Sequence, residues 1–163
     1  MKKIIYVLIL LLITNFSFAA SGSSGSSDNK DKGGSGLTSV YKQGKNFVLK
    51  AKKIEKKGNF EEALKLYSKG YDKLLEAYAK DKENPDLLNY LGFSLRKKGN
   101  FEEAEKFYLA GLKIKPKHKG INEYLGELYL ETNRIELAKE RLEVLKTCKC
   151  KEYRELKELI EKN

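Results

Sequence analysis

The segment Lys56-Lys-Gly-Asn-Phe-Glu-Glu-Ala63 occurs a second time, letter for letter, as Lys97-Lys-Gly-Asn-Phe-Glu-Glu-Ala104. A degenerate third copy follows as Asn133-Arg-Ile-Glu-Leu-Ala138. The spacing is 34 residues between Ala104 and Ala138, and again between Gly92 and Gly126, which close two copies of Tyr-Leu-Gly. A fixed spacing of this length is typical of a solenoid in which each unit is a pair of helices.

Apolar side chains between the copies recur with the period of a helix. Leu88, Leu91 and Leu95 are spaced i, i+3 and i+7, so they share one helical face. Asn84-Pro85 comes just before them and supplies a capping side chain followed by a proline, whose missing N–H is not needed in the first turn. We therefore expect an all-α fold of about seven helices without strands.

The repeat resembles the tetratricopeptide repeat (TPR), in which a Leu-Gly pair of the first helix packs against a small residue of the second. The residues that match are Leu91-Gly92, Leu125-Gly126, Ala63, Ala104 and Ala138. The resemblance implies a TPR-type α-solenoid of three units, about 44–84, 85–118 and 119–152, closed by a C-terminal capping helix over 150–162. The whole pattern is also similar to small exported alphaproteobacterial proteins of this family, from which no activity can be carried over.

The first unit departs from the period. It is seven residues longer than the second, and Lys50-Ala51 replaces the Leu-Gly pair. Seven residues are two turns of helix and keep the apolar face in phase. We therefore expect one long second helix, about 60–81, that overhangs the stack.

The N-terminus reads as a signal peptide over 1–19. Lys2 and Lys3 precede ten apolar residues, and Ser17-Phe18-Ala19 offers a signal-peptidase site. A Gly/Ser-rich segment over 20–36 is expected to be a flexible linker before the TPR domain of 37–163. These features predict a periplasmic or secreted protein, or a membrane-tethered one if the signal is kept as an anchor.

Residues for catalysis or metal binding are scarce. His118 is the single histidine, and no Cys, Asp or Glu lies within three residues of it. We expect it to be a solvent-exposed turn residue, because a metal site needs three or four ligands at fixed spacing. No phosphate-binding loop and no nucleophile next to a base is present in the sequence. We predict a non-enzymatic protein without cofactor or metal.

Cys148 and Cys150 are the two cysteines of the chain. In an oxidising compartment such a pair favours a local disulfide, which here would staple the turn before the capping helix. Redox exchange, metal binding and intermolecular pairing remain alternatives.

The formal net charge is +10. The lysines are interleaved with glutamates at helical spacing, as on a solvated face, which argues against nucleic-acid binding. We expect a monomer whose membrane contact is at most peripheral.

The family resemblance implies that a peptide or helix binds in the concave groove lined by the first helix of each unit. Phe93 is expected to be an exposed aromatic anchor in this groove, with cations on one side and carboxylates on the other. The predicted groove residues are Lys52, Lys56, Asn89, Phe93, Arg96, Lys97, Glu123 and Glu127. We therefore predict an exported protein-interaction module. The alternatives are a charge-driven binder of anionic envelope polymer or lipid, and a thiol-redox accessory protein that uses Cys148 and Cys150.

Overall fold

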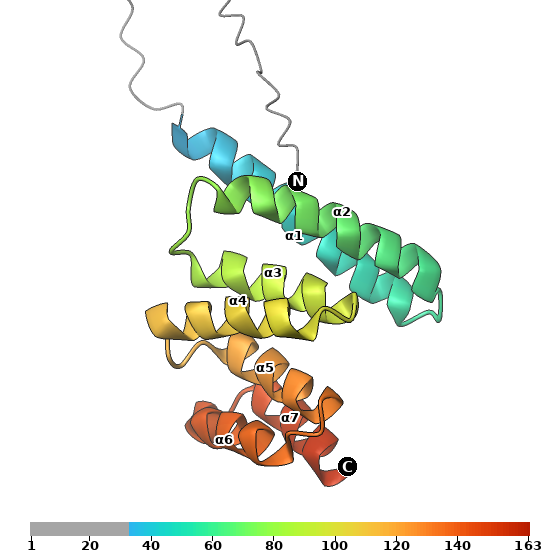
Figure 1. Ribbon diagram of the computed structural model, residues 1–163, viewed down its shortest axis with the longest axis vertical. Helices are drawn as coiled ribbons and strands as arrows, with labels where there is room; N and C mark the ends of the chain where they lie inside the picture. Colours follow the sequence, from blue (N-terminus) through green and yellow to red (C-terminus); the bar gives the residue numbers. More distant parts are fainter. Residues whose placement is uncertain (1–32) are drawn as a thin grey trace, which may run out of the picture. The chain divides into compact units, whose positions relative to one another are not determined.

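The computed structural model describes residues 33–163, which form seven α-helices and one short 3-10 helix (Figure 1). The helices are α1 (Gly33–Glu55), α2 (Phe60–Tyr78), α3 (Pro85–Lys97), α4 (Phe101–Ile114), α5 (Lys119–Glu131), α6 (Ile135–Leu145), η1 (Lys146–Cys148) and α7 (Lys151–Glu161). Residues 33–163 contain no strand, so the predicted all-α class is confirmed. The predicted signal peptide and residues 20–32 of the predicted linker lie outside the described residues.

Three helix pairs follow one another along the chain. Helix α1 packs against α2, α3 against α4, and α5 against α6. Contacts of α2 with α3 and of α4 with α5 join successive pairs, and α7 packs on α5 and α6. Asp31–Asn163 is a compact unit by itself.

The repeated segment forms the turn inside each pair. Gly58 and Gly99 have φ values of 83° and 80°, and Asn133 takes the same role in the third pair with a φ of 57°. Glycine and asparagine adopt this left-handed conformation at least cost, which explains their place in the repeat.

Small residues stand where helices approach each other, as predicted. A Cβ on Gly92 would lie 2.7 Å from the Tyr108 ring across the α3–α4 contact. A Cβ on Gly126 would lie 2.6 Å from Leu156, so α7 rests on α5 at this point. Leu156 is fully buried, which confirms α7 as the cap of the last pair.

The predicted long second helix is present as α2, which ends at Tyr78, but its extra turns do not overhang alone. Helix α1 begins at Gly33, within the segment predicted as linker, and runs beside them. The extra turns of the two helices face each other, since a Cβ on Gly44 would lie 2.7 Å from Leu74 and 3.1 Å from the Gly70 carbonyl oxygen. Leu37, Val40 and Tyr41 of α1 join the core there, an apolar stripe that the repeat pattern did not include. Among the helices of residues 33–163, none combines the length and apolarity needed to cross a bilayer.

Candidate functional site

The predicted groove residues lie on α1, α3 and α5, except for Lys56 in the turn after α1, and they border two adjoining hollows. Hollow A has a volume of about 410 Å³ and includes Asn89 and His118 in its lining. Hollow B has a volume of about 400 Å³ and includes Lys56, Arg96 and Lys97. Every one of the eight predicted residues lines at least one hollow.

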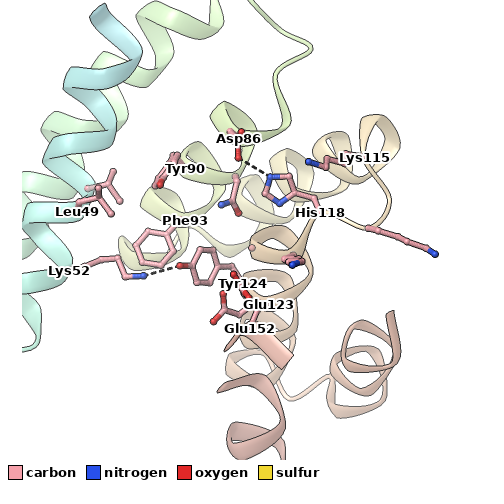
Figure 2. A pocket seen from close by; sticks show the side chains of 15 residues that line it. Leu49, Lys52, Asp86, Tyr90, Phe93, Lys115, His118, Glu123, Tyr124 and Glu152 are labelled. Carbon is pink, nitrogen blue, oxygen red and sulfur yellow. Dashed lines mark hydrogen bonds and ion pairs between the residues drawn. The ribbon is translucent and has the colours of Figure 1, made fainter. Parts of the chain in front are cut away.

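A contact between α1 and α5 separates the two hollows. Lys52 Nζ donates to the Tyr124 hydroxyl at 2.8 Å, a contact we call the Lys52–Tyr124 bridge (Figure 2). The same ammonium lies 4.9 Å from the centroid of the Phe93 ring and 5.0 Å from that of Tyr124, within the range of cation–π attraction. Both hollows share Lys52, Phe93 and Tyr124, together with Glu123.

The prediction that Phe93 is an exposed anchor is wrong. Only 2% of Phe93 is exposed. Its ring centroid lies 4.7 Å from that of Tyr124 and 5.7 Å from that of Tyr67, so aromatic rings from α5 and α2 enclose it. Phe93 therefore forms the floor under the Lys52–Tyr124 bridge. Its ring joins α3 to α2 and α5.

Arg96 does not offer the free cation that was expected. Its side chain is 1% exposed, and its guanidinium donates to both Glu127 and Glu131 of α5. A buried guanidinium needs such partners, because an unpaired buried charge is very costly. The side chain joins α3 to α5.

Lys97 is also neutralised, by Glu55 at the end of α1. Its ammonium donates to Glu55 Oε1 at 2.8 Å, and the Tyr67 hydroxyl donates to Oε2 at 2.6 Å. Burial by itself would raise the pKa of Glu55, but these hydrogen bonds and the charge of Lys97 bring that pKa below its ordinary value. Lys56 is exposed and takes part in no ion pair within residues 33–163, so it is an accessible and unpaired cation of hollow B.

Glu123 of α5 faces Glu155 of α7 and is 4% exposed. Burial, the hydrogen bond with Glu155 and the charge of nearby Glu127 raise the pKa of the Glu123 carboxyl well above its usual range. Glu123 therefore holds a proton toward Glu155 at acidic pH and contributes less negative charge to the groove than its formal charge implies.

Helix α7, which was predicted only as a cap, also lines the groove. Glu152 borders hollow A, and Glu155, Glu158 and Leu159 border hollow B. Their spacing of three or four residues marks one helical face, and this signal was available in the sequence.

The expectation that His118 is solvent-exposed is also wrong, since it is 8% exposed and caps α5. Its Nδ1 accepts the N–H of Ile121 at 3.2 Å, so in the neutral ring Nε2 carries the hydrogen and donates to Asp86 Oδ1 at 3.0 Å. This pair joins the starts of α3 and α5 at one end of hollow A (Figure 2). The sequence signal was the position of His118 directly before a helix.

Other polar groups of hollow A lack partners. Asn89 is 7% exposed, and its Oδ1 accepts no hydrogen bond within the described part of the chain. Lys115, Lys117 and Lys119 are exposed and form no ion pair with any residue of 33–163. Hollow A is consequently rich in unpaired cations, whereas most cations of hollow B are paired.

The two cysteines lie next to the cap. Cys148 and Cys150 are paired in the structure across a Cα–Cα distance of 5.1 Å, which is within the range of disulfides. The disulfide of the exported protein stays a prediction. Residues 33–163 contain no group of three His, Cys, Asp or Glu side chains that could hold a metal ion.

Residues 85–118, which are the predicted second unit, match the family model of the tetratricopeptide repeat. This segment is a tetratricopeptide repeat, and the helix pairs of residues 33–163 have the fold of a TPR solenoid. No curated protein matches its sequence closely enough to be a relative.

Solved structures share this TPR fold at low sequence identity. The type III secretion chaperone SycD of Yersinia enterocolitica, in complex with a peptide of the translocator YopD, has a TM-score of 0.53 at 17% identity; the match covers 78% of this chain and 88% of that one. The second TPR domain of human RPAP3, in complex with an HSP70 peptide, has a TM-score of 0.51 at 20% identity. That match covers 78% of this chain and 99% of the RPAP3 domain. The Arabidopsis OM64 TPR domain has a TM-score of 0.51 at 14% identity, and the match covers 76% of this chain and 98% of the OM64 domain. At these identities the likeness concerns the fold alone.

Proposed function

We propose that this protein is an exported, non-enzymatic interaction module that binds a peptide or short helix in the groove formed by α1, α3, α5 and α7. The observation that carries the proposal is the pair of adjoining hollows on the predicted face, with the aromatic floor of Phe93 and Tyr124 between them. Two proteins of similar fold, SycD and the RPAP3 domain, are seen with bound peptides, which supports the same use of the fold here.

The chemistry of the two hollows suits a polypeptide. Leu49 in hollow A and Leu159 in hollow B are 39% and 37% exposed, so each offers an apolar contact that a ligand would cover. Asn89 and the lysines of hollow A supply hydrogen-bond donors, and an amide with a free acceptor suits a peptide backbone N–H. Apolar contacts beside a few polar groups are the usual composition of a peptide-binding groove.

The test compares two double variants against a partner captured from envelope extract with the wild-type protein. Leu49→Ser with Leu159→Ser removes both apolar contacts of the groove. Leu75→Ser with Ile135→Ser is the matched control, because those side chains are 36% and 39% exposed and line neither hollow. We expect the groove variant to lose at least about tenfold in affinity, since a buried leucine contributes about 1.5–3 kcal/mol. The control should bind within about twofold of wild type.

An equal loss in both variants would contradict groove binding. Repeating the titration at low and physiological salt distinguishes groove binding from the alternative, in which the protein binds an anionic polymer through its charge. That alternative predicts a steep loss of affinity with salt and no response to the leucine substitutions. Phe93→Ala is not a suitable probe, because removing this buried ring would disturb the fold as well as the groove.

The groove proposal includes export, which rests on the N-terminal sequence. We expect the protein recovered from a bacterial host to begin near Ala20 and to fractionate with the periplasm or medium. Intact-mass measurement of each fraction tests this, and an uncleaved chain in the membrane fraction would favour an anchored form.

A further inference from the structure

A third hollow lies away from the groove, between α4 and α6. Its volume is about 550 Å³, and its floor consists of Leu109, Leu112, Pro116 and Val144. Leu109 is 42% exposed, which leaves apolar surface open to water. We call this site the outer hollow.

Cations border the apolar floor. Lys113 and Lys117 form no ion pair with any residue of 33–163. Arg141 has only Glu140, at a distance of 3.4 Å, and its buried Nε has no hydrogen-bond partner in the described structure. An apolar floor under a rim of poorly paired cations is complementary to an amphiphile with an anionic head group.

We propose that the outer hollow docks the protein on the surface of a bilayer that contains anionic phospholipid. Phosphate head groups pair with Lys113, Lys117 and Arg141, while Leu109 and its apolar neighbours contact the acyl boundary. A lysine or arginine close to such a surface contributes about fivefold in affinity. Without Lys2 and Lys3 of the signal peptide the formal net charge of +10 becomes +8, which adds a long-range attraction that an extended anionic surface exploits better than a single peptide does.

The N-terminal segment of the same chain fits the outer hollow less well than an anionic bilayer surface does. In the exported chain this segment is residues 20–32, which carry two lysines, two aspartates and no apolar side chain larger than alanine. It offers neither net negative charge to the cationic rim nor an apolar side chain to the floor. The bilayer proposal is independent of peptide binding in the groove, because among the outer-hollow residues only Lys117 also lines hollow A.

The test is a vesicle co-sedimentation titration with the chain from residue 20 onward, which omits the apolar run and keeps the compact unit of 31–163. One vesicle is pure phosphatidylcholine, and the other contains about one third phosphatidylglycerol. We expect binding to the anionic vesicle and at least about tenfold weaker binding to the neutral one.

Two charge variants locate the contact. Lys113→Gln with Arg141→Gln should weaken binding to the anionic vesicle about thirtyfold. Lys106→Gln with Lys139→Gln removes the same charge from the same two helices, but these lysines pair with Glu103 and Glu136 outside the outer hollow. This control should lose less than about threefold, and Leu109→Ser should lose about fivefold through its apolar contact.

Circular dichroism melting verifies that each variant is folded before it is titrated. Equal losses in the two charge variants would overturn the proposal, because diffuse charge would then explain the attraction. Equal binding of wild type to both vesicles, or to neither, would overturn it as well. A monomeric acidic peptide that competes as well as the anionic vesicle would assign the outer hollow to a protein partner instead.

Discussion

The two identical octapeptides, 56–63 and 97–104, have the same backbone in different surroundings. Gly58 and Gly99 share a left-handed φ near 80°, and Asn59 and Asn100 precede their helices at φ values of −90° and −87°. Eight identical residues therefore give the same turn and the same helix start in both pairs.

The side chains of the two copies nevertheless have different neighbours. Phe101 packs against the core of the second and third pairs, whereas Phe60 is 64% exposed. Lys97 pairs with Glu55, but the equivalent Lys56 forms no ion pair within residues 33–163. Local sequence decides the turn, while the flanking helices decide which side chains are buried or paired.

The largest effect is expected where the first two pairs differ in sequence. Gly92 is replaced by Ala51 in the first pair, so the first pair accommodates a Cβ that the second does not. Gly92→Leu would drive the new side chain into the Tyr108 ring and should reduce the free energy of unfolding by about 3 kcal/mol or more. Urea denaturation measures this, and a wild-type midpoint would show that α3 and α4 are not in close contact.

The two phenylalanines should differ clearly in their contribution to stability. Phe101→Ala removes a ring that packs on the core and should cost about 2 kcal/mol. Phe60→Ala should stay within about 0.5 kcal/mol, because that ring is mostly in solvent. Thermal melts of both variants test the difference, and equal shifts in Tm would mean that Phe60 is covered in solution.

The two turn glycines should behave alike. Neither Gly58 nor Gly99 has any atom within 4 Å of the position of a Cβ, so an alanine is disfavoured only by the positive φ. Gly58→Ala and Gly99→Ala should each reduce stability by about 1 kcal/mol. A twofold difference between them in urea denaturation would contradict a purely local origin of the turn.

The smallest loss of stability is expected at one of the two capping asparagines. Asn59 Oδ1 accepts the N–H of Glu62 at 3.3 Å, whereas the Asn100 side chain forms no capping hydrogen bond. Asn59→Ala should therefore cost about 1 kcal/mol, and Asn100→Ala only about 0.3 kcal/mol. Differential scanning calorimetry of the two variants measures the contrast, and the reverse order would contradict the assignment of the cap to Asn59.

Much of the fold could be predicted from the sequence because its determinants are local. The Gly and Ala positions of the repeat mark where helices touch, and Asn84-Pro85 marks the start of α3, where the Asn84 side chain accepts the N–H of Leu87 at 3.1 Å. The long α1 was missed because the Gly-rich start of this helix resembles a linker, although Val40 and Tyr41 pack against the core of the first two pairs.

The sequence predicted where the candidate site lies, but not which of its side chains are exposed or unpaired. All eight predicted residues line the hollows, but the exposure of Phe93 and the free charge of Arg96 were predicted wrongly. Both errors arise from partners that are distant in sequence, namely Tyr124 above Phe93 and Glu127 and Glu131 beside Arg96. Helical spacing specifies a face, whereas only the packing of α3 against α5 specifies what covers it.

The Lys52–Tyr124 bridge makes ligand length a selection criterion for the proposed groove. A short ligand could occupy hollow A or hollow B and leave the bridge intact, so the two hollows could act as independent compartments. A longer ligand that runs through both would first have to separate Lys52 from Tyr124, which adds an activated step to association. Short ligands would then bind in one phase and long ones in two, with the slower phase reporting the opening of the bridge.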